Sequence, residues 1–155
     1  MQSSEDTVIR KILLLAFCAC LCACGADESD PAAAVRAWVA DAEQAAEEKD
    51  RHGLLSMISQ NYADSRGNDH DRIGKILQAY FFRQQTIELL TSINEISLMG
   101  DSAALVSLTL GMVGTNNSML GISADAYEFE LELEVANDHW MLIGARWGET
   151  GSMLR

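Results

Sequence analysis

Hydrophobic positions in the first part of the sequence recur every three or four residues, which is the spacing of amphipathic α-helices. The series is made up of Val35, Trp38, Val39, Ala42 and Ala46. It predicts a helix over 31–49. Asp30 suits the N-cap position and Pro31 the first helical position, so the helix has a defined start.

Two further helices are predicted before residue 84. Gly53 interrupts the first periodic stretch, and a short helix is expected at 54–61. The segment 64–68 has the residue types of a turn and predicts a loop. A third helix is expected at 69–83, with Asn68 or Asp69 as its cap.

The period then shortens to two, which is typical of β-strands. A run rich in β-branched residues predicts a strand over 87–98, with a bulge near Leu89-Leu90. Gly100-Asp101 turns the chain into a second strand whose alternation continues to Met112. An eleven-residue loop is expected at 114–124.

The third strand alternates without interruption. Its hydrophobic side consists of Tyr127, Phe129, Leu131, Leu133 and Val135, and its other side of Glu128, Glu130, Glu132 and Glu134. A hairpin at Asn137-Asp138 leads into a fourth strand at 140–147. Because only one side of the third strand is apolar, the helices must cover that side. The predicted class is α+β, with N-terminal helices packed on an antiparallel sheet.

A separate hydrophobic run precedes the predicted domain. Arg10 and Lys11 are followed by twelve uncharged residues, 12–23. As a helix this run is about 18 Å long, which is short of the ~30 Å hydrocarbon core of a bilayer. A basic flank, a short apolar run and small residues at its end are the pattern of a signal peptide, predicted here at 1–23.

The end of this run resembles a bacterial lipobox. The residues Leu21-Cys22-Ala23-Cys24 place an aliphatic residue and two small ones before a cysteine. The resemblance implies cleavage before Cys24, diacylglycerol on its sulfur and acylation of its amine. Residues 24–30 would then form a lipidated tether. Gly25 after the cysteine favours the outer membrane, with the domain facing the periplasm; two or more acyl chains give stable anchoring.

Metal and cofactor chemistry find little support in the sequence. All four cysteines lie in the string Cys18, Cys20, Cys22 and Cys24, and the residues between them are Ala, Leu and Ala. Zinc sites usually combine two separated pairs of ligands, which this string does not offer. We therefore expect neither a metal nor a cofactor.

The charge balance argues against nucleic acid as a partner. The 155 residues include 23 Asp and Glu against 11 Lys and Arg, for a net charge of −12. Such a charge repels phosphate backbones.

The order of helices and strands over 31–148 is similar to that of the nuclear transport factor 2-like, or ketosteroid isomerase-like, fold. The segment Tyr62-Ala63-Asp64 after the second helix and the last strand, 140–147, support the resemblance. It implies a curved sheet around helices, shaped as a cone with a pocket at its wide end. Residues 149–155 are expected to be frayed.

The resemblance directs attention to side chains that could surround such a pocket. The polar candidates are Tyr62, Asp64, Tyr80, Arg83, Gln84 and Asp125, and the wall candidates are Trp38, Phe81, Met112 and Trp147. In an enzyme, Asp64 or Asp125 would be the base and Tyr80 a hydrogen-bond donor to an oxyanion. Asp64 lies beside Ser65 and Gly67, however, where Asp usually stabilises a turn.

Two functions follow as hypotheses. The first is a lipid-anchored protein of the bacterial cell envelope with a non-catalytic binding or structural role, with the membrane and a small apolar ligand as partners. The alternative is a small cofactor-free enzyme, an isomerase, dehydratase or hydrolase, that moves a proton with a carboxylate. A homodimer through the sheet is a further expectation.

Overall fold

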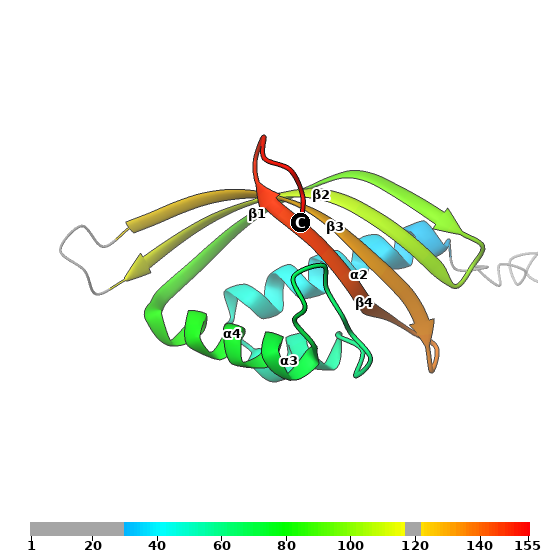
Figure 1. Ribbon diagram of the computed structural model, residues 1–155, viewed down its shortest axis with the longest axis horizontal. Coiled ribbons are helices and arrows are strands. Elements are labelled where there is room, and N and C mark those ends of the chain that lie inside the picture. The colour runs from blue at the N-terminus through cyan, green and yellow to red at the C-terminus, as the bar shows by residue number, and fades with distance from the viewer. Residues whose placement is uncertain (1–29, 117–121) are drawn as a thin grey trace, which may run out of the picture. The chain divides into compact units, whose positions relative to one another are not determined.

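The computed structural model describes residues 30–116 and 122–155. Its elements are α2 (Pro31–Glu47), α3 (Arg51–Ser56), α4 (His70–Arg83), β1 (Gln84–Met99), β2 (Ala103–Asn116), β3 (Ile122–Ala136) and β4 (His139–Glu149). The strands form one antiparallel sheet in the order β1-β2-β3-β4. In Figure 1 this sheet arches over the helices, which lie on one face of it. The predicted α+β class is confirmed.

The helix starts follow from capping side chains. Asp69 accepts a hydrogen bond from the backbone N–H of Arg72 at 2.8 Å, so α4 begins where the sequence predicted. Asp50 accepts one from the N–H of Gly53 at 2.9 Å. The short helix therefore starts at Arg51 and includes Gly53, and the predicted range 54–61 is wrong.

The strands are longer than the sequence pattern predicted. Thr115 pairs with Ile122 across β2 and β3, so most of the expected loop at 114–124 belongs to strands. Residues 117–121 lie outside the description. At the next hairpin, Asn137 and Asp138 both have positive φ (51° and 63°), as a two-residue type I′ turn requires.

The bulge in β1 is not at Leu89-Leu90. Those two residues follow normal alternation, with Leu90 77% exposed on the outer side. The register shifts instead between Ile93 and Glu95, and again between Gln84 and Thr86. The extra residue after Ile93 allows Ile93 and Ile96, three apart in sequence, both to pack against the core.

The core lies between α2 and the concave side of the sheet. Its buried side chains include Val35 and Val39 from α2 and Val106, Leu108 and Leu133 from the strands. These residues and the whole sheet belong to one compact unit, Pro31–Arg155. This unit therefore contains a complete hydrophobic core of its own.

The segment 57–65 runs along the outer edge of β4. The N–H groups of Ser59 and Ala63 donate to the carbonyls of Leu142 and Ile143, at 2.9 and 3.1 Å. Leu142 in turn donates to the carbonyl of Met57 at 3.0 Å. This edge of the sheet is therefore paired with chain that comes before α4.

The C-terminal residues are not frayed as predicted. Trp147 and Arg155 exchange two backbone hydrogen bonds, of 3.2 and 3.3 Å. The Arg66 guanidinium lies 4.4 Å from the centre of the Trp147 ring and donates to the Trp147 carbonyl at 2.9 Å. The backbone pair and a hydrogen bond from Arg66 Nε to the Arg155 carbonyl (3.5 Å) hold the tail against β4.

Within the described part of the chain, no helix has the length and hydrophobicity needed to cross a membrane. The predicted signal peptide, Cys24 and the tether up to residue 29 lie outside the described residues.

Candidate functional site

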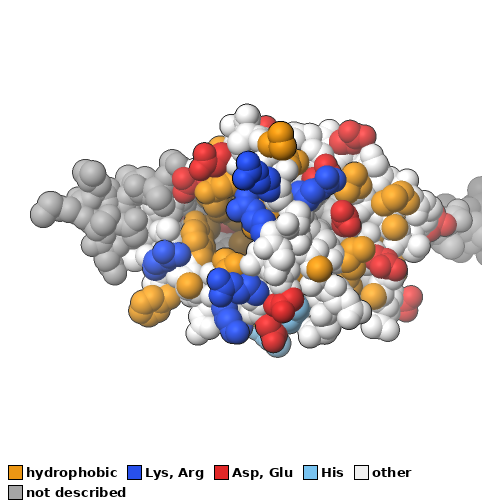
Figure 2. All heavy atoms as spheres, in the orientation of Figure 1, with side chains coloured by type: hydrophobic (Ala, Val, Ile, Leu, Met, Phe, Trp, Pro, Cys, Tyr) orange, Lys and Arg blue, Asp and Glu red, His pale blue; other side chains and the backbone are white. Residues whose placement is uncertain are grey.

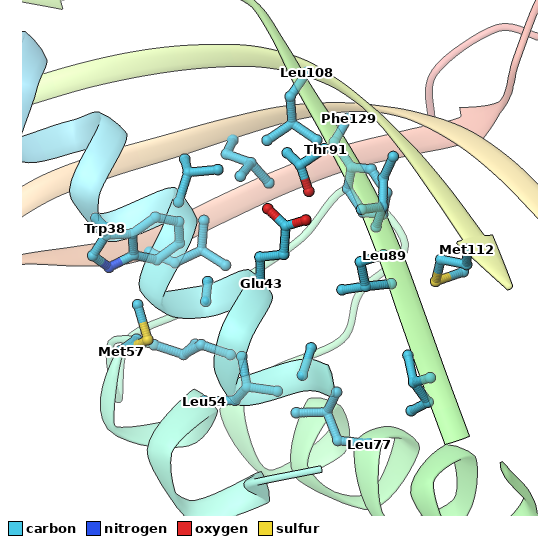
Figure 3. A pocket seen from close by; sticks show the side chains of 18 of the residues that line it. Trp38, Glu43, Leu54, Met57, Leu77, Leu89, Thr91, Leu108, Met112 and Phe129 are labelled. Atoms are coloured by element: carbon cyan, nitrogen blue, oxygen red, sulfur yellow. The ribbon is translucent and has the colours of Figure 1, made fainter. Parts of the chain in front are cut away.

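A cavity of about 310 Å³ lies between the helices and the concave side of the sheet. All three helices and all four strands contribute to its lining, which is almost entirely apolar. Figure 3 shows side chains from α2 and from the strands pointing into this space from opposite sides. The cavity therefore combines a concave shape with an apolar wall, as ligand sites generally do.

Small side chains on α2 help to keep this space empty. Ala42 and Ala46 line the cavity on the side of α2 that faces the sheet. Larger side chains at these positions would extend toward Leu108 and Leu110 on β2, which also line it. The curvature that the β1 bulge gives to the sheet adds to the depth of the space.

The predicted wall residues divide into two groups. Trp38, Phe81 and Met112 line the cavity. Trp147 does not; its ring stacks on Phe129 at 6.2 Å between centroids and 17° between planes, and Phe129 is the one that lines the cavity.

Tyr80 lies on the cavity wall with its hydroxyl 4.0 Å from the sulfur of Met112. Burial raises the pKa of Tyr80, and the negative charge of Asp125 raises it further, while the charge of Arg83 acts to lower it. Tyr80 is therefore a neutral hydrogen-bond donor at physiological pH. Asp125 is exposed on β3 opposite Met112 and does not line the cavity.

Asp64, the first candidate for a base, lies outside the cavity. Its buried carboxylate accepts hydrogen bonds from the N–H groups of Arg66 (2.9 Å) and Asn68 (2.8 Å) and from the Asn68 side chain (2.8 Å). The Tyr62 hydroxyl donates to it at 3.4 Å. Burial, with the charge of Asp64 beside it, raises the pKa of Tyr62. These contacts make Asp64 a turn residue.

Two polar candidates at the junction of α4 and β1 also lie outside the lining. Arg83 donates from Nε to the carbonyl of Ala79 at 3.2 Å. Gln84 follows it as the first residue of β1, with its side-chain oxygen buried and without a hydrogen-bond partner. Neither reaches the cavity wall.

Glu43 is the functional candidate that the sequence pattern did not single out. It is the one acidic residue in the cavity lining. In Figure 3 its carboxylate and the hydroxyl of Thr91 on β1 point toward one another. Among the described residues, no hydrogen-bond donor or cation pairs with the Glu43 carboxylate. A signal was present, since Glu43 follows Val39 by four residues and so shares its side of the helix.

Metal ligands do not gather in the residues that the structure describes: no group of three or more His, Cys, Asp or Glu side chains there could hold an ion. The chemistry that the cavity offers is apolar contact, one carboxylate and two hydroxyl groups, those of Tyr80 and Thr91.

No protein-family model and no curated protein sequence matches the chain. Several solved structures match the chain. A candidate scytalone dehydratase of Novosphingobium aromaticivorans matches with a TM-score of 0.70 and 11% identity, over 79% of this chain and 84% of its own. A candidate dehydratase of the NTF2-like family from Streptomyces avermitilis matches with a TM-score of 0.67 and 11% identity. This match covers 79% of this chain and 98% of its own.

A ketosteroid isomerase-like protein of Erwinia carotovora also matches, with a TM-score of 0.65 and 13% identity, over 80% of this chain and 99% of its own. Identities this low show the fold alone. Because these matches cover most of both chains, the domain has the nuclear transport factor 2-like fold, as its order of elements predicted.

Proposed function

We propose that the domain binds a small apolar ligand without catalysis, and that a lipid on Cys24 anchors it to a bacterial membrane on the periplasmic side. The observation that supports ligand binding is the apolar cavity of about 310 Å³. Pockets for small ligands begin near 300 Å³ and are mostly apolar, with a few polar groups that orient the ligand. A purely structural domain has no need for such a space, since closing it would gain packing.

Filling the cavity tests ligand binding. The soluble fragment 27–155 contains the whole compact unit and can be titrated with the neutral dye N-phenyl-1-naphthylamine, whose fluorescence rises in apolar surroundings. We expect Ala46→Leu, which lines the cavity, to weaken dye binding at least about tenfold because it occupies the site. Ala40→Leu is the matched control, since Ala40 is exposed on the same helix. Equal loss in both variants would contradict the proposal.

Metabolic labelling with a tagged palmitate tests the anchor. We expect the wild-type chain to carry the label and Cys24→Ala to lose it and to keep the unprocessed leader. Cys22→Ala is the matched control, because it alters a cysteine two residues earlier and leaves a small residue in the lipobox. Separation of the two membranes by density then tests the outer-membrane location. Unchanged labelling of Cys24→Ala would refute the anchor.

A second candidate function is a cofactor-free enzyme that transfers a proton. Glu43 favours it, as a carboxylate in an apolar cavity whose wall also holds the neutral hydroxyl of Tyr80. The solved structures with this fold include a candidate scytalone dehydratase and a ketosteroid isomerase-like protein. The test is exchange of α-protons of an apolar ketone such as 2-tetralone for solvent deuterium. Exchange that Glu43→Gln abolishes would favour catalysis over binding alone.

A further inference from the structure

The single carboxylate inside the cavity constrains what the ligand can be. Glu43 enters from α2, and in Figure 3 its oxygens lie among apolar side chains, opposite the hydroxyl of Thr91. No described residue donates a hydrogen bond to it or forms an ion pair with it. The carboxylate therefore lies on the cavity wall without a described protein group bonded to it.

A carboxylate can only accept hydrogen bonds, and an acceptor that loses water without gaining a donor costs free energy. An entirely apolar occupant would impose that cost by displacing the water. An anionic occupant would add repulsion, which the low dielectric of the cavity strengthens. An occupant that donates a hydrogen bond avoids both penalties.

Positive charge near the cavity does not reverse the preference for a hydrogen-bond donor over an anion. On the face drawn in Figure 2, Lys and Arg side chains border a hollow that has hydrophobic side chains within it. Arg83 is exposed near Tyr80, and Asp125 of opposite charge acts on the same hydroxyl. Charges outside in solvent are screened by salt, whereas Glu43 lies on the cavity wall.

We propose, building on the ligand-binding function above, that the ligand is an apolar molecule bearing one hydrogen-bond-donating group, an amine or an alcohol, and that Glu43 is the acceptor that selects it. Thr91 lies beside the carboxylate and can accept or donate a second hydrogen bond to the same group.

Three compounds on one hydrocarbon cage test this selection: adamantan-1-amine, adamantan-1-ol and adamantane-1-carboxylate, each displacing N-phenyl-1-naphthylamine from fragment 27–155. We expect the amine and the alcohol to bind at least about tenfold more tightly than the carboxylate, with the amine tightest, because its protonated form adds charge attraction to the hydrogen bond.

Two variants identify the acceptor. Glu43→Leu should weaken binding of the amine about ten- to a hundredfold, and should weaken dye binding much less, because the uncharged diarylamine N–H of the dye is a poorer partner for a carboxylate. Glu43→Gln should remove the discrimination against the carboxylate. Glu48→Leu is the matched control: Glu48 is exposed just after α2, and we expect the wild-type order of affinities in that variant.

The outcomes separate this inference from the proposed function. If the carboxylate compound binds the wild type as tightly as the amine, or if Glu43→Leu leaves amine affinity unchanged, the inference is refuted while ligand binding stands. If neither the dye nor any cage compound binds, the proposed ligand-binding function is itself refuted.

Discussion

Asp64 organises the loop before α4 with a single side chain. Its two oxygens receive two backbone N–H groups, one amide and one hydroxyl, all from residues 62–68. The sequence was compatible with either a catalytic base or a turn at this position. The turn is what the contacts support, because a carboxylate with four donors and no access to the cavity has no substrate to act on.

Replacing Asp64 should therefore affect folding and leave the cavity intact. Asp64→Ala leaves the buried donors without an acceptor, and we expect a loss of about 2–4 kcal/mol in the free energy of unfolding, measured with urea. Asp41→Ala, on the exposed side of α2, should change it by less than about 0.5 kcal/mol. Equal stability of the two variants would show that these hydrogen bonds contribute little.

Tyr62 should make the domain less stable at alkaline pH. Burial and Asp64 raise its folded-state pKa above the ordinary value of about 10. Below pH 10 both states hold the proton, and the hydroxyl's contribution is fully present. As the pH rises above 10, the unfolded state loses its proton first, so stability falls. Urea midpoints between pH 8 and 11 should decline less steeply in Tyr62→Phe. Parallel declines would contradict this.

The residues around the cavity were only partly predictable. Trp38, Phe81 and Met112 were accessible to sequence reasoning because each lies on the apolar side of a periodic element. Glu43 was not among the candidates, because charged residues on a helix usually lie on its solvent side. Glu43 follows the buried Val39 by four residues, and this spacing places it on the side of α2 that faces the sheet. A carboxylate is tolerated on that side because the cavity lies there.

Among the elements, α2, α4 and β3 followed the sequence closely because long uninterrupted periods define them. The loop at 114–124 was overestimated because Gly, Ser, Thr and Asn are typical of turns, while pairing with neighbouring strands holds 114–116 and 122–124 in the sheet. The bulge was misplaced because a pattern of side chains does not reveal which cross-strand partner is skipped. The length of the loop and the position of the bulge both depend on pairing between strands, which local sequence does not specify.

A side chain of α2 stabilises the free edge of β1. Glu47 accepts a hydrogen bond from the N–H of Leu89 at 2.8 Å. In Glu47→Ala we expect faster amide hydrogen exchange over 84–91, measured by mass spectrometry, because that N–H is left to water. Glu48→Ala is the matched control, since Glu48 is exposed and accepts from Gln44 within its own segment. Unchanged exchange in Glu47→Ala would show that β1 does not depend on this contact.

At the scale of the whole molecule, the resemblance in the order of elements implied both the α+β cone and a pocket within it, but not the volume of that pocket. Its volume depends on the depth of sheet curvature and on two alanines that a sequence pattern reads simply as helix formers. Lipid attachment, location and association with a second copy stay predictions.

The outer side of the sheet is where a homodimer would form. Glu130 pairs with Arg146 there, while Leu90 (77% exposed) and Val113 (46%) present apolar surface on β1 and β2, where Glu88 lies opposite Val113. We expect the native mass of fragment 27–155 to be that of a dimer, and Leu90→Glu to give monomers by placing a charge in the contact. A monomeric mass for the unaltered fragment at about 100 µM would exclude the dimer.

The pairing of 57–65 with β4 also bears on solubility. Strand edges whose N–H and C=O groups lack partners can recruit strands from other chains and start fibrous aggregates. On the β4 side, the groups of Leu142 and Ile143 are already bonded within the chain. At high protein concentration, the β4 edge is therefore protected from aggregation by the addition of strands from other molecules. Cutting the covering segment with a protease would remove this protection.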